Sequence, residues 1–481
     1  MVNDTWTYRK QNDVLFWGFS IITIISILAA VSMYSILPIA IPLGLIGLYF
    51  AIVDVKFVFY ALIAMLAFST EIELPNGIGT ELPGEPLMLL MTGLYGIFIF
   101  SKPQKAFIPL SYPITQLLLL HLAWIAITIV TSENPIVSTK FLLAKIWYVV
   151  PFYFTPFLLL KEKVHVKKLI YILMTSVLVA SFYVMAMHLG TGLSFEGINK
   201  AVQPFFRNHV DYACLLVITL PYIFIVYWQS KKTELALILL PIVFYVLIAI
   251  YFTYTRAAMG SVVIGAGAYF ALKYKLTKLS FGGAIVGALL VLGFMVQQNR
   301  FMDYAPNFEK TITHKDFDNL LEATAKGEDI STMERVYRWV AGVQMIVERP
   351  IVGYGANNFY PYYKKKTLAS FETYVSDNPE KSGIHSYYLM TAVEQGIPGL
   401  IIFLTLLYTL LVTAERTYHR LKDSFYQLLV AAAYVSIVII LSLLVVNDLL
   451  EADKVGPFFF LAAAFIVLAN RQLKAESKES D

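Results

Sequence analysis

One histidine and a few arginines have the side chains best suited to chemistry in this sequence. His385 lies where a long polar segment meets an apolar block, and Arg207 and Arg256 each precede another apolar block. A histidine has an ordinary pKa of about 6.5, so it can accept a proton at neutral pH. An arginine binds phosphate through paired hydrogen bonds from its planar guanidinium group. These residue types suit acid–base chemistry on a substrate that carries phosphate.

Arg207 lies directly before the apolar block that begins at about residue 209. The start of a helix attracts anions, so an arginine there is poorly placed unless a phosphate binds beside it. Its neighbours Asn208 and His209 could then join the same anion site. The alternative is that the long Arg207 side chain only reaches out to the membrane interface. We expect Arg207 to bind substrate, with Asn208 and His209 as supporting residues.

Arg256 lies between two apolar blocks with almost no polar loop between them. A charge near membrane depth is costly and marks a candidate functional residue, unless the turn simply exposes it to water. His385 is expected to begin a helix, whose N-terminus lowers the pKa of the imidazole and favours its neutral, basic form. A capping or interfacial histidine is the alternative. We expect Arg256 to be a functional residue and His385 to be able to act as a base.

The long polar segment, residues 298–384, contains the pattern of an amphipathic helix over residues 332–349. A capping-box sequence begins it, valines recur along it at helical spacing, and Pro350 ends it. Arg335 and Arg338 lie one turn apart, off the apolar stripe. We expect this helix to lie across the mouth of the bundle, with Arg335 as a candidate site residue and Arg338 as a supporting one.

Glu394 lies well inside the apolar block that follows His385. A carboxylate at that depth needs a partner, so we expect a structural or hydrogen-bonding role rather than catalysis. Gly396, Pro398 and Gly399 follow at once and predict a bend in the helix that carries it.

The composition indicates a membrane protein. Of the 481 residues, 58% are hydrophobic and 15% are charged, whereas soluble domains are roughly 25% charged. Apolar blocks of about 20 residues, enough to cross a bilayer, recur along the chain, and we predict an all-α polytopic membrane protein with about 12–14 transmembrane helices. The first block is too long for a signal-peptide core and is expected to be an uncleaved span. The candidate blocks lie at about 14–36, 37–53, 56–70, 86–100, 111–131, 141–160, 167–190, 209–229, 234–253, 257–272, 279–297, 386–413, 424–446 and 455–470.

The distribution of Lys and Arg predicts the orientation of the chain. With the N-terminus inside the cell, most of the basic residues that lie beyond the long polar segment fall in inside loops, as the positive-inside rule requires. The few in short outside segments are Lys140, Lys145, Lys200, Arg207, Arg256 and Lys454. Both termini are then cytoplasmic, and the long polar segment and His385 face the outer side.

The predicted organisation follows from these assignments. The expected parts are an N-terminal transmembrane bundle over 1–297, an outer loop over 298–384, C-terminal transmembrane helices over 385–470 and a cytoplasmic tail over 471–481. The outer loop is nearly neutral, so we expect no nucleic-acid partner. The single cysteine, Cys214, excludes an intramolecular disulfide and a cysteine metal site. No histidine pair has metal-ligand spacing, and we prefer a solvated acidic loop to a cation site for the four glutamates at 71–85.

Three stretches of the sequence resemble the O-antigen ligase/polymerase superfamily of bacterial envelope enzymes. They are Thr253-Tyr254-Thr255-Arg256-Ala257-Ala258, then Arg335-x-x-x-Trp339 with Pro350-Ile351-Val352-Gly353-Tyr354-Gly355-Ala356-Asn357-Asn358-Phe359, and His385-Ser386-x-Tyr388-Leu389 with Glu394-x-Gly396-x-x-Gly399. Arg207-Asn208-His209 fits more loosely. Thr255, Ala257 and Ser386 depart from the residues usual in the family, while the arginine and the histidine are kept.

The resemblance implies a membrane glycosyltransferase with a GT-C-like helical bundle in the bacterial inner (cytoplasmic) membrane. It implies transfer of a glycan from undecaprenyl diphosphate to an acceptor hydroxyl at the periplasmic face, with inversion and without a metal or other cofactor. Arg207, Arg256 and Arg335 would bind the diphosphate, and His385 would be the catalytic base. The first expectation is O-antigen ligation onto lipid A–core.

Three alternatives stay open at this point. A growing glycan as acceptor would make the protein an O-antigen or exopolysaccharide polymerase, and a protein acceptor is a further variant. A transporter of lipid-linked glycans could also use Arg207 and Arg256 to bind an anionic lipid, although the sequence has neither internal repeats nor a chain of charges at mid-membrane.

Overall fold

The computed structural model describes residues 2–35, 37–73, 79–106, 108–230, 234–297, 330–363, 366 and 383–480. By its contacts the chain divides into two compact units, residues 1–63 and 64–481. The first unit contains α1 (Val2–Ser32), the 3-10 turn η1 (Leu37–Ile39), α2 (Ala40–Val53) and most of α3 (Val55–Met65). Large apolar side chains along α1, such as Trp17 at 64% exposed, lie open on its surface. Such a surface suits contact with lipid.

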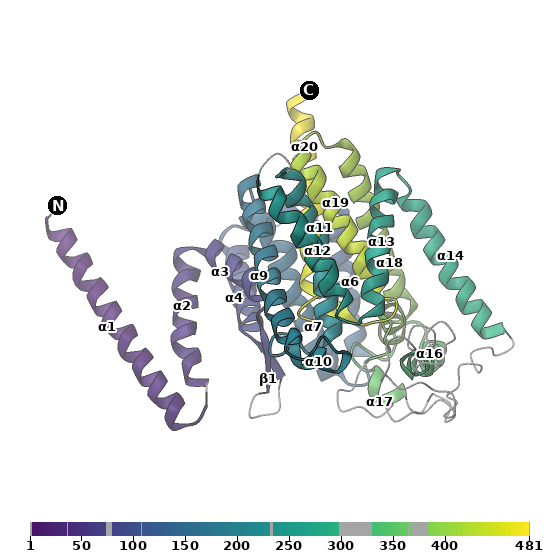
Figure 1. Ribbon diagram of the computed structural model, residues 1–481, viewed down its shortest axis with the longest axis horizontal. Coiled ribbons are helices and arrows are strands. Elements are labelled where there is room, and N and C mark those ends of the chain that lie inside the picture. The colour runs from purple at the N-terminus through teal and green to yellow at the C-terminus, as the bar shows by residue number, and fades with distance from the viewer. Residues whose placement is uncertain are drawn as a thin grey trace. The chain divides into compact units, whose positions relative to one another are not determined.

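The second unit is a helical bundle with one small hairpin (Figure 1). Strands β1 (Thr70–Glu73) and β2 (Gly79–Leu82) pair antiparallel, with Thr70 opposite Leu82. The elements from α4 to α12 are α4 (Gly84–Ser101), α5 (Pro103–Ala106), η2 (Ile108–Ser111), α6 (Pro113–Val130), α7 (Pro135–Val149), the π turn η3 (Val150–Phe154), α8 (Thr155–Leu159), α9 (Lys163–Leu189), α10 (Phe195–Ala201), α11 (His209–Gln229) and α12 (Leu235–Tyr251). The remaining ones are α13 (Arg256–Lys273), α14 (Thr277–Val296), α16 (Ile330–Glu348), α17 (Phe359–Tyr363), α18 (Tyr387–Arg420), α19 (Ser424–Leu443), η7 (Leu449–Glu451) and α20 (Gly456–Ser480).

Within the described residues, nine helices are long and apolar enough to cross a membrane, and four shorter apolar helices accompany them. The expectation of an all-α polytopic membrane protein is therefore confirmed. Helix α13, expected as a span over 257–272, is not among the nine; Arg256 and Lys273 form its two ends. Helix α16 lies where the sequence predicts an amphipathic helix over 332–349.

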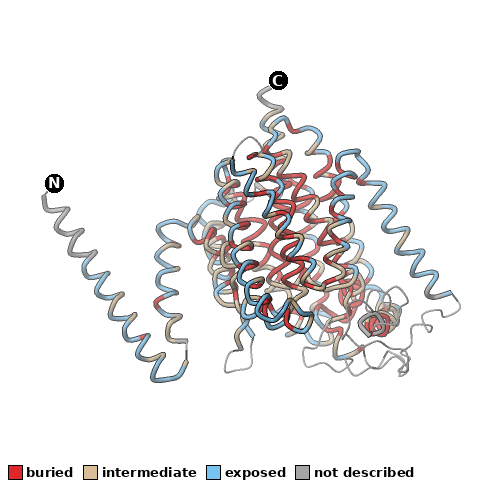
Figure 2. The backbone as a smooth tube through the Cα atoms, viewed as in Figure 1, coloured by how far each residue is buried: buried red, intermediate tan, exposed pale blue. Residues whose placement is uncertain are grey.

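The core of the larger unit is formed by α11, α19 and α20. In their apolar stretches, 83%, 67% and 78% of the residues are buried, respectively. These helices are apolar on all sides, as expected of helices surrounded by others. Burial is concentrated in the middle of this unit, whereas α14 is mostly exposed (Figure 2). The central helices thereby give the loops at their ends a rigid base.

Helices α13 and α19 run antiparallel. Gly265 of α13 packs against Ile439, and at the far end of α13 the Thr277 Oγ1 atom lies 2.9 Å from the Tyr434 hydroxyl. The start of α13 therefore lies beside the end of α19. We name this the α16 end of the bundle, because α10, α16, α17 and β1 lie there too, opposite the chain's C-terminus (Figure 1).

Helix α18 is interrupted at Gly396, where the backbone has φ +72° and ψ 178°. Pro398 has no N–H, so the Glu394 carbonyl loses its partner within the helix. That carbonyl accepts instead from the N–H of Gly355, at 2.9 Å. The predicted bend is confirmed, and the freed backbone groups become a docking site for the segment after α16.

The same interruption exchanges two further backbone hydrogen bonds. The N–H of Ile397 donates to the Pro350 carbonyl at 2.7 Å, and the N–H of Tyr354 donates to the Val393 carbonyl at 3.0 Å. The segment that follows α16 is therefore joined to α18 as a strand-like partner. The second and third family-like stretches, far apart in the sequence, are therefore in direct contact in the structure.

Candidate functional site

The chain enters α18 through a tight turn at His385. This residue has a positive φ of 56°, and the helix itself begins only at Tyr387. Asp448, which follows α19, holds the turn: its Oδ2 atom accepts the N–H of His385 at 3.3 Å, and the carboxylate also accepts the N–H of Ser386. A Cβ atom on Gly383 would lie 2.0 Å from the same Oδ2. The turn is thus wrapped around a carboxylate, with glycine needed for the close approach.

Arg338 of α16 supports this turn from the other side. Its side chain is fully buried, and its Nη1 atom donates to the Gly383 carbonyl at 2.6 Å. Its Nε atom is 2.9 Å from Glu334, and the guanidinium lies 5.4 Å from the Tyr363 ring centre. These contacts give Arg338 a part in positioning the His385 turn.

Arg335, one turn earlier on α16, is half-buried and donates from Nε to the Val446 carbonyl at 3.3 Å. Burial, and then Arg338 and Arg335, lower the pKa of His385 to about 3. The imidazole is therefore neutral at physiological pH, the form that a general base requires, and the same effects make it a weak base while no anion is bound beside it. The sequence attributed the neutral form to a helix N-terminus, whereas in the structure its causes are burial and two guanidinium groups.

Asp448 is the site residue that the sequence analysis missed. Burial raises its pKa to about 6, against the opposing effects of the backbone N–H groups of His385 and Ser386 and of the two arginines of α16. Its second oxygen, Oδ1, is buried and has no hydrogen-bond donor within the described parts of the chain. Asp448 thus binds the His385 backbone through Oδ2, while its Oδ1 atom has no donor among the described residues.

A second group of predicted residues lies at the start of α11. Asn208 is the N-cap residue, and its Oδ1 atom accepts the N–H groups of Val210 and Asp211 at 2.9 and 3.0 Å. Arg207 lies just before it and is exposed. The side chain of Asn208 therefore fixes where α11 begins and presents Arg207 at that helix start.

His209 joins this helix start to that of α13. Its Nδ1 atom lies 2.8 Å from the Thr253 carbonyl and 3.2 Å from the Thr255 hydroxyl. Arg256, half-buried, is the first residue of α13. The structure thus brings Arg207, His209 and Arg256 to neighbouring helix starts.

The two groups lie at the same end of the bundle, the α16 end. The N–H of Tyr387 donates to the Leu444 carbonyl at 2.9 Å, so the start of α18 is joined to the end of α19. The start of α13, with Arg256, lies beside that same end. Arg256 and His385 therefore lie at one end of the bundle.

Glu394 lies apart from both groups, buried within α18. Its carboxylate accepts the backbone N–H groups of Phe359, at 3.3 Å, and of Asn357. It therefore fastens the segment that follows α16 to the interrupted helix. This agrees with the hydrogen-bonding role expected for it.

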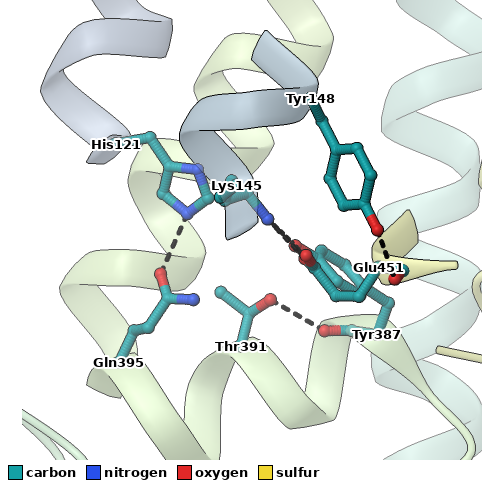
Figure 3. Close-up of polar contacts among 7 residues, drawn as sticks. All are labelled: His121, Lys145, Tyr148, Tyr387, Thr391, Gln395 and Glu451. Carbon is teal, nitrogen blue, oxygen red and sulfur yellow. Dashed lines mark hydrogen bonds and ion pairs between the residues drawn. The ribbon is translucent and has the colours of Figure 1, made fainter. Parts of the chain in front are cut away.

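A buried polar network, which the sequence did not reveal, includes Tyr387, two residues after His385 (Figure 3). Lys145 of α7, expected in an outside segment, is only 2% exposed; it pairs with Glu451 and lies 2.7 Å from the Tyr387 hydroxyl. His121 of α6 lies nearby, 2.9 Å from the Gln395 Oε1 atom. The network links α6, α7 and α18 to the segment between α19 and α20.

That segment makes two more polar attachments. Asp453 accepts a hydrogen bond from the Tyr148 hydroxyl. Lys454, also expected in an outside segment, is buried; it donates to the carbonyls of Leu66 and Ser69 at 2.9 and 2.7 Å and pairs with Glu81 at 3.2 Å. The sequence signal for these roles was four ionisable residues within one short connection between two apolar blocks.

Fold and site together define a polytopic membrane protein with a neutral histidine and several arginines at one end of a helical bundle. A family model described as O-antigen ligase matches residues 241–404, a segment that contains Arg256, α16, His385 and the interruption of α18. The resemblance to the O-antigen ligase superfamily is therefore confirmed over this segment. The match supports, in general terms, a glycosyltransferase of the ligase/polymerase type that acts on lipid-linked glycans in a bacterial membrane. Among curated proteins no match is found.

Proposed function

We propose that this protein transfers a glycan from undecaprenyl diphosphate to an acceptor hydroxyl at the periplasmic face of the inner membrane. The acceptor in this proposal is lipid A–core, which makes the reaction an O-antigen ligation. Arg207, Arg256 and Arg335 bind the diphosphate of the donor, and His385 is the catalytic base.

The arginines stabilise the diphosphate that leaves in this reaction. As the bond between the anomeric carbon and the phosphate oxygen breaks, that oxygen takes the electron pair and negative charge grows on the diphosphate. Guanidinium groups in a site of low polarity stabilise such charge through bidentate hydrogen bonds. The helix starts that carry Arg207 and Arg256 add their N-terminal dipoles to the same effect.

His385 activates the acceptor, because a sugar hydroxyl is a weak nucleophile without a base. The neutral imidazole takes the hydroxyl proton while the oxygen attacks the anomeric carbon from the face opposite the diphosphate, which inverts that centre. A bound diphosphate adds negative charge near the site. It offsets the influence of Arg335 and Arg338 and strengthens His385 as a base when the donor is present.

One observation carries the proposal: a neutral histidine lies between Asp448 and two arginines at the same end of the bundle as Arg256.

The test is transfer in proteoliposomes that contain a glycan linked to undecaprenyl diphosphate and a lipid A–core acceptor. Arg256→Ala and His385→Ala should each lower the rate by about a hundredfold or more, the usual size of a lost catalytic group. Arg416→Ala is the matched control, since Arg416 is exposed near the other end of α18 and should leave the rate unchanged. Full transfer by both site variants would refute the proposal.

The products distinguish the related functions. Lipid A–core that carries the glycan indicates a ligase, whereas a lengthened glycan that stays on undecaprenyl diphosphate indicates a polymerase. Movement of the donor across the bilayer without any transfer would instead indicate a transporter.

A further inference from the structure

The ion pair between Lys145 and Glu451 has no part in the chemistry described so far. Lys145 is 2% exposed and lies inside the apolar helix α7, where its ammonium group also lies 5.1 Å from the Phe141 ring centre. A lysine at such depth is costly, and removing it from water is offset only by close partners. An apolar pair would fill the same space more simply, so the charges call for a functional explanation.

The third partner is Tyr387. Its fully buried hydroxyl accepts from Lys145 Nζ at 2.7 Å and donates to Glu451 Oε1 at 2.7 Å. Its carbonyl accepts from the Thr391 hydroxyl at 2.8 Å (Figure 3). The first residue of α18 is therefore held through its side chain and through its backbone.

Tyr387 and Glu451 both lie close to the residues that form the His385 turn. Tyr387 follows it by two positions, and the 3-10 turn η7 that carries Glu451 begins directly after Asp448, which accepts the His385 N–H. One short turn thus holds the histidine backbone with one carboxylate and the helix start with another. Lys145 anchors that turn to α7.

We propose that Lys145, Glu451 and Tyr387 are positioning residues that hold His385 in its left-handed conformation and fix the direction of its imidazole. This inference rests on the proposed function of His385. The positive φ of 56° is unfavourable for a histidine, so surrounding contacts must impose it. Without the ion pair, η7 and the start of α18 separate, and the imidazole leaves its productive geometry.

The experiment removes both charges together, because a single substitution would leave one buried charge unpaired. The double variant Lys145→Met/Glu451→Gln should fold, with a thermal unfolding temperature in detergent close to that of the wild type. Its kcat for transfer should fall about tenfold or more while KM stays within about twofold, because donor binding by the arginines is retained and the base is misplaced.

Tyr387→Phe is the second variant, and it removes a single oxygen while the ion pair stays. We expect a smaller fall in kcat, of about three- to tenfold, again without a change in KM. It keeps the inference testable if the double variant does not fold. The control is Lys163→Met/Asp423→Asn, which removes a more exposed ion pair, with Nζ–Oδ2 of 2.7 Å, between the first residue of α9 and the N-cap of α19, whereas His385 lies beside the other end of α19; its kcat should be that of the wild type.

A substrate-free measurement tests the same inference. Diethyl pyrocarbonate carbethoxylates neutral imidazoles, and peptide mass spectrometry reports the rate at His385 alone. Both site variants should raise that rate severalfold because the turn loosens, and the control pair should not. An unchanged rate at His385, or an unchanged kcat in a folded double variant, would overturn the inference. A wild-type protein that transfers no glycan would overturn the proposed function instead, which keeps the two failures apart.

Discussion

Gly396→Ala tests the interlock between α18 and the segment that follows α16. Gly396 has φ +72° and ψ 178°, a region that is nearly restricted to glycine and costs other residues about 1–3 kcal/mol. An added Cβ would lie 2.1 Å from the Ile351 carbonyl oxygen, far inside contact distance and against backbone that cannot rotate away. The two segments must therefore separate.

Separation breaks the hydrogen bond of 2.7 Å from Ile397 to Pro350 and leaves buried backbone groups without partners. That costs a further 1–3 kcal/mol or so. The substitution should lower the free energy of unfolding by roughly 2–6 kcal/mol in total, a large share of the stability of a typical protein.

The assay monitors unfolding in detergent by intrinsic fluorescence. The variant Gly287→Ala, measured in the same way, is the control. Gly287 lies within α14 and a Cβ there would meet nothing within 4 Å. An alanine in a helix is favoured over glycine by about 0.5–1 kcal/mol, so the control should be neutral or slightly stabilising. Glycan transfer by Gly396→Ala should fall as well. If Gly396→Ala is as stable as the control, the interlock does not hold these segments together and the reasoning is wrong.

Two further predictions concern the groups around His385. Arg338→Met removes the donor that lies 2.9 Å from the buried Glu334 carboxylate, and it should lower the free energy of unfolding by about 3–5 kcal/mol in the same assay. The double variant Arg338→Met/Glu334→Gln should recover most of this loss. A single variant as stable as the wild type would contradict the prediction. Acidification from about pH 7.5 to about 5 protonates Asp448, whose pKa is about 6, long before His385, whose pKa is about 3. Since the protonated acid holds the His385 turn less firmly, kcat/KM should decline with an apparent pKa of about 6, and an acid limb that persists in Asp448→Asn would argue against the assignment.

Much of the architecture could be predicted because hydropathy alone specifies membrane helices. Apolar blocks of the right length, the amphipathic pattern before Pro350 and the glycine and proline residues after Glu394 each have a local cause. The same holds for the arginines and the histidine, since a charge beside an apolar block is visible without knowing what lies opposite. The resemblance then added roles that the residues alone left open.

The residues that the sequence did not reveal act through partners that are distant in the sequence, from 63 positions away for Asp448 and His385 to 388 positions away for Lys454 and Leu66. In the sequence, nothing distinguishes Asp448, Glu451 and Lys454 from other residues of a short outer connection, and Lys145 is one basic residue among several. Their roles depend on which carbonyl, hydroxyl or carboxylate lies opposite, and no periodicity records that. Hydropathy therefore predicts which elements exist, and long-range polar pairing, which decides where His385 lies, has to be seen in three dimensions.

The attachment of Lys454 to Leu66, Ser69 and Glu81 bears on the order of assembly during synthesis. Ribosomes synthesise Leu66, Ser69 and the β1–β2 hairpin long before the connection between α19 and α20, yet the two carbonyls and the Glu81 carboxylate are paired with the Lys454 ammonium of that connection. Asp448 and Glu451 arrive in the same late stretch. A nascent chain therefore lacks the groups that hold the His385 turn until the segment between α19 and α20 has been synthesised.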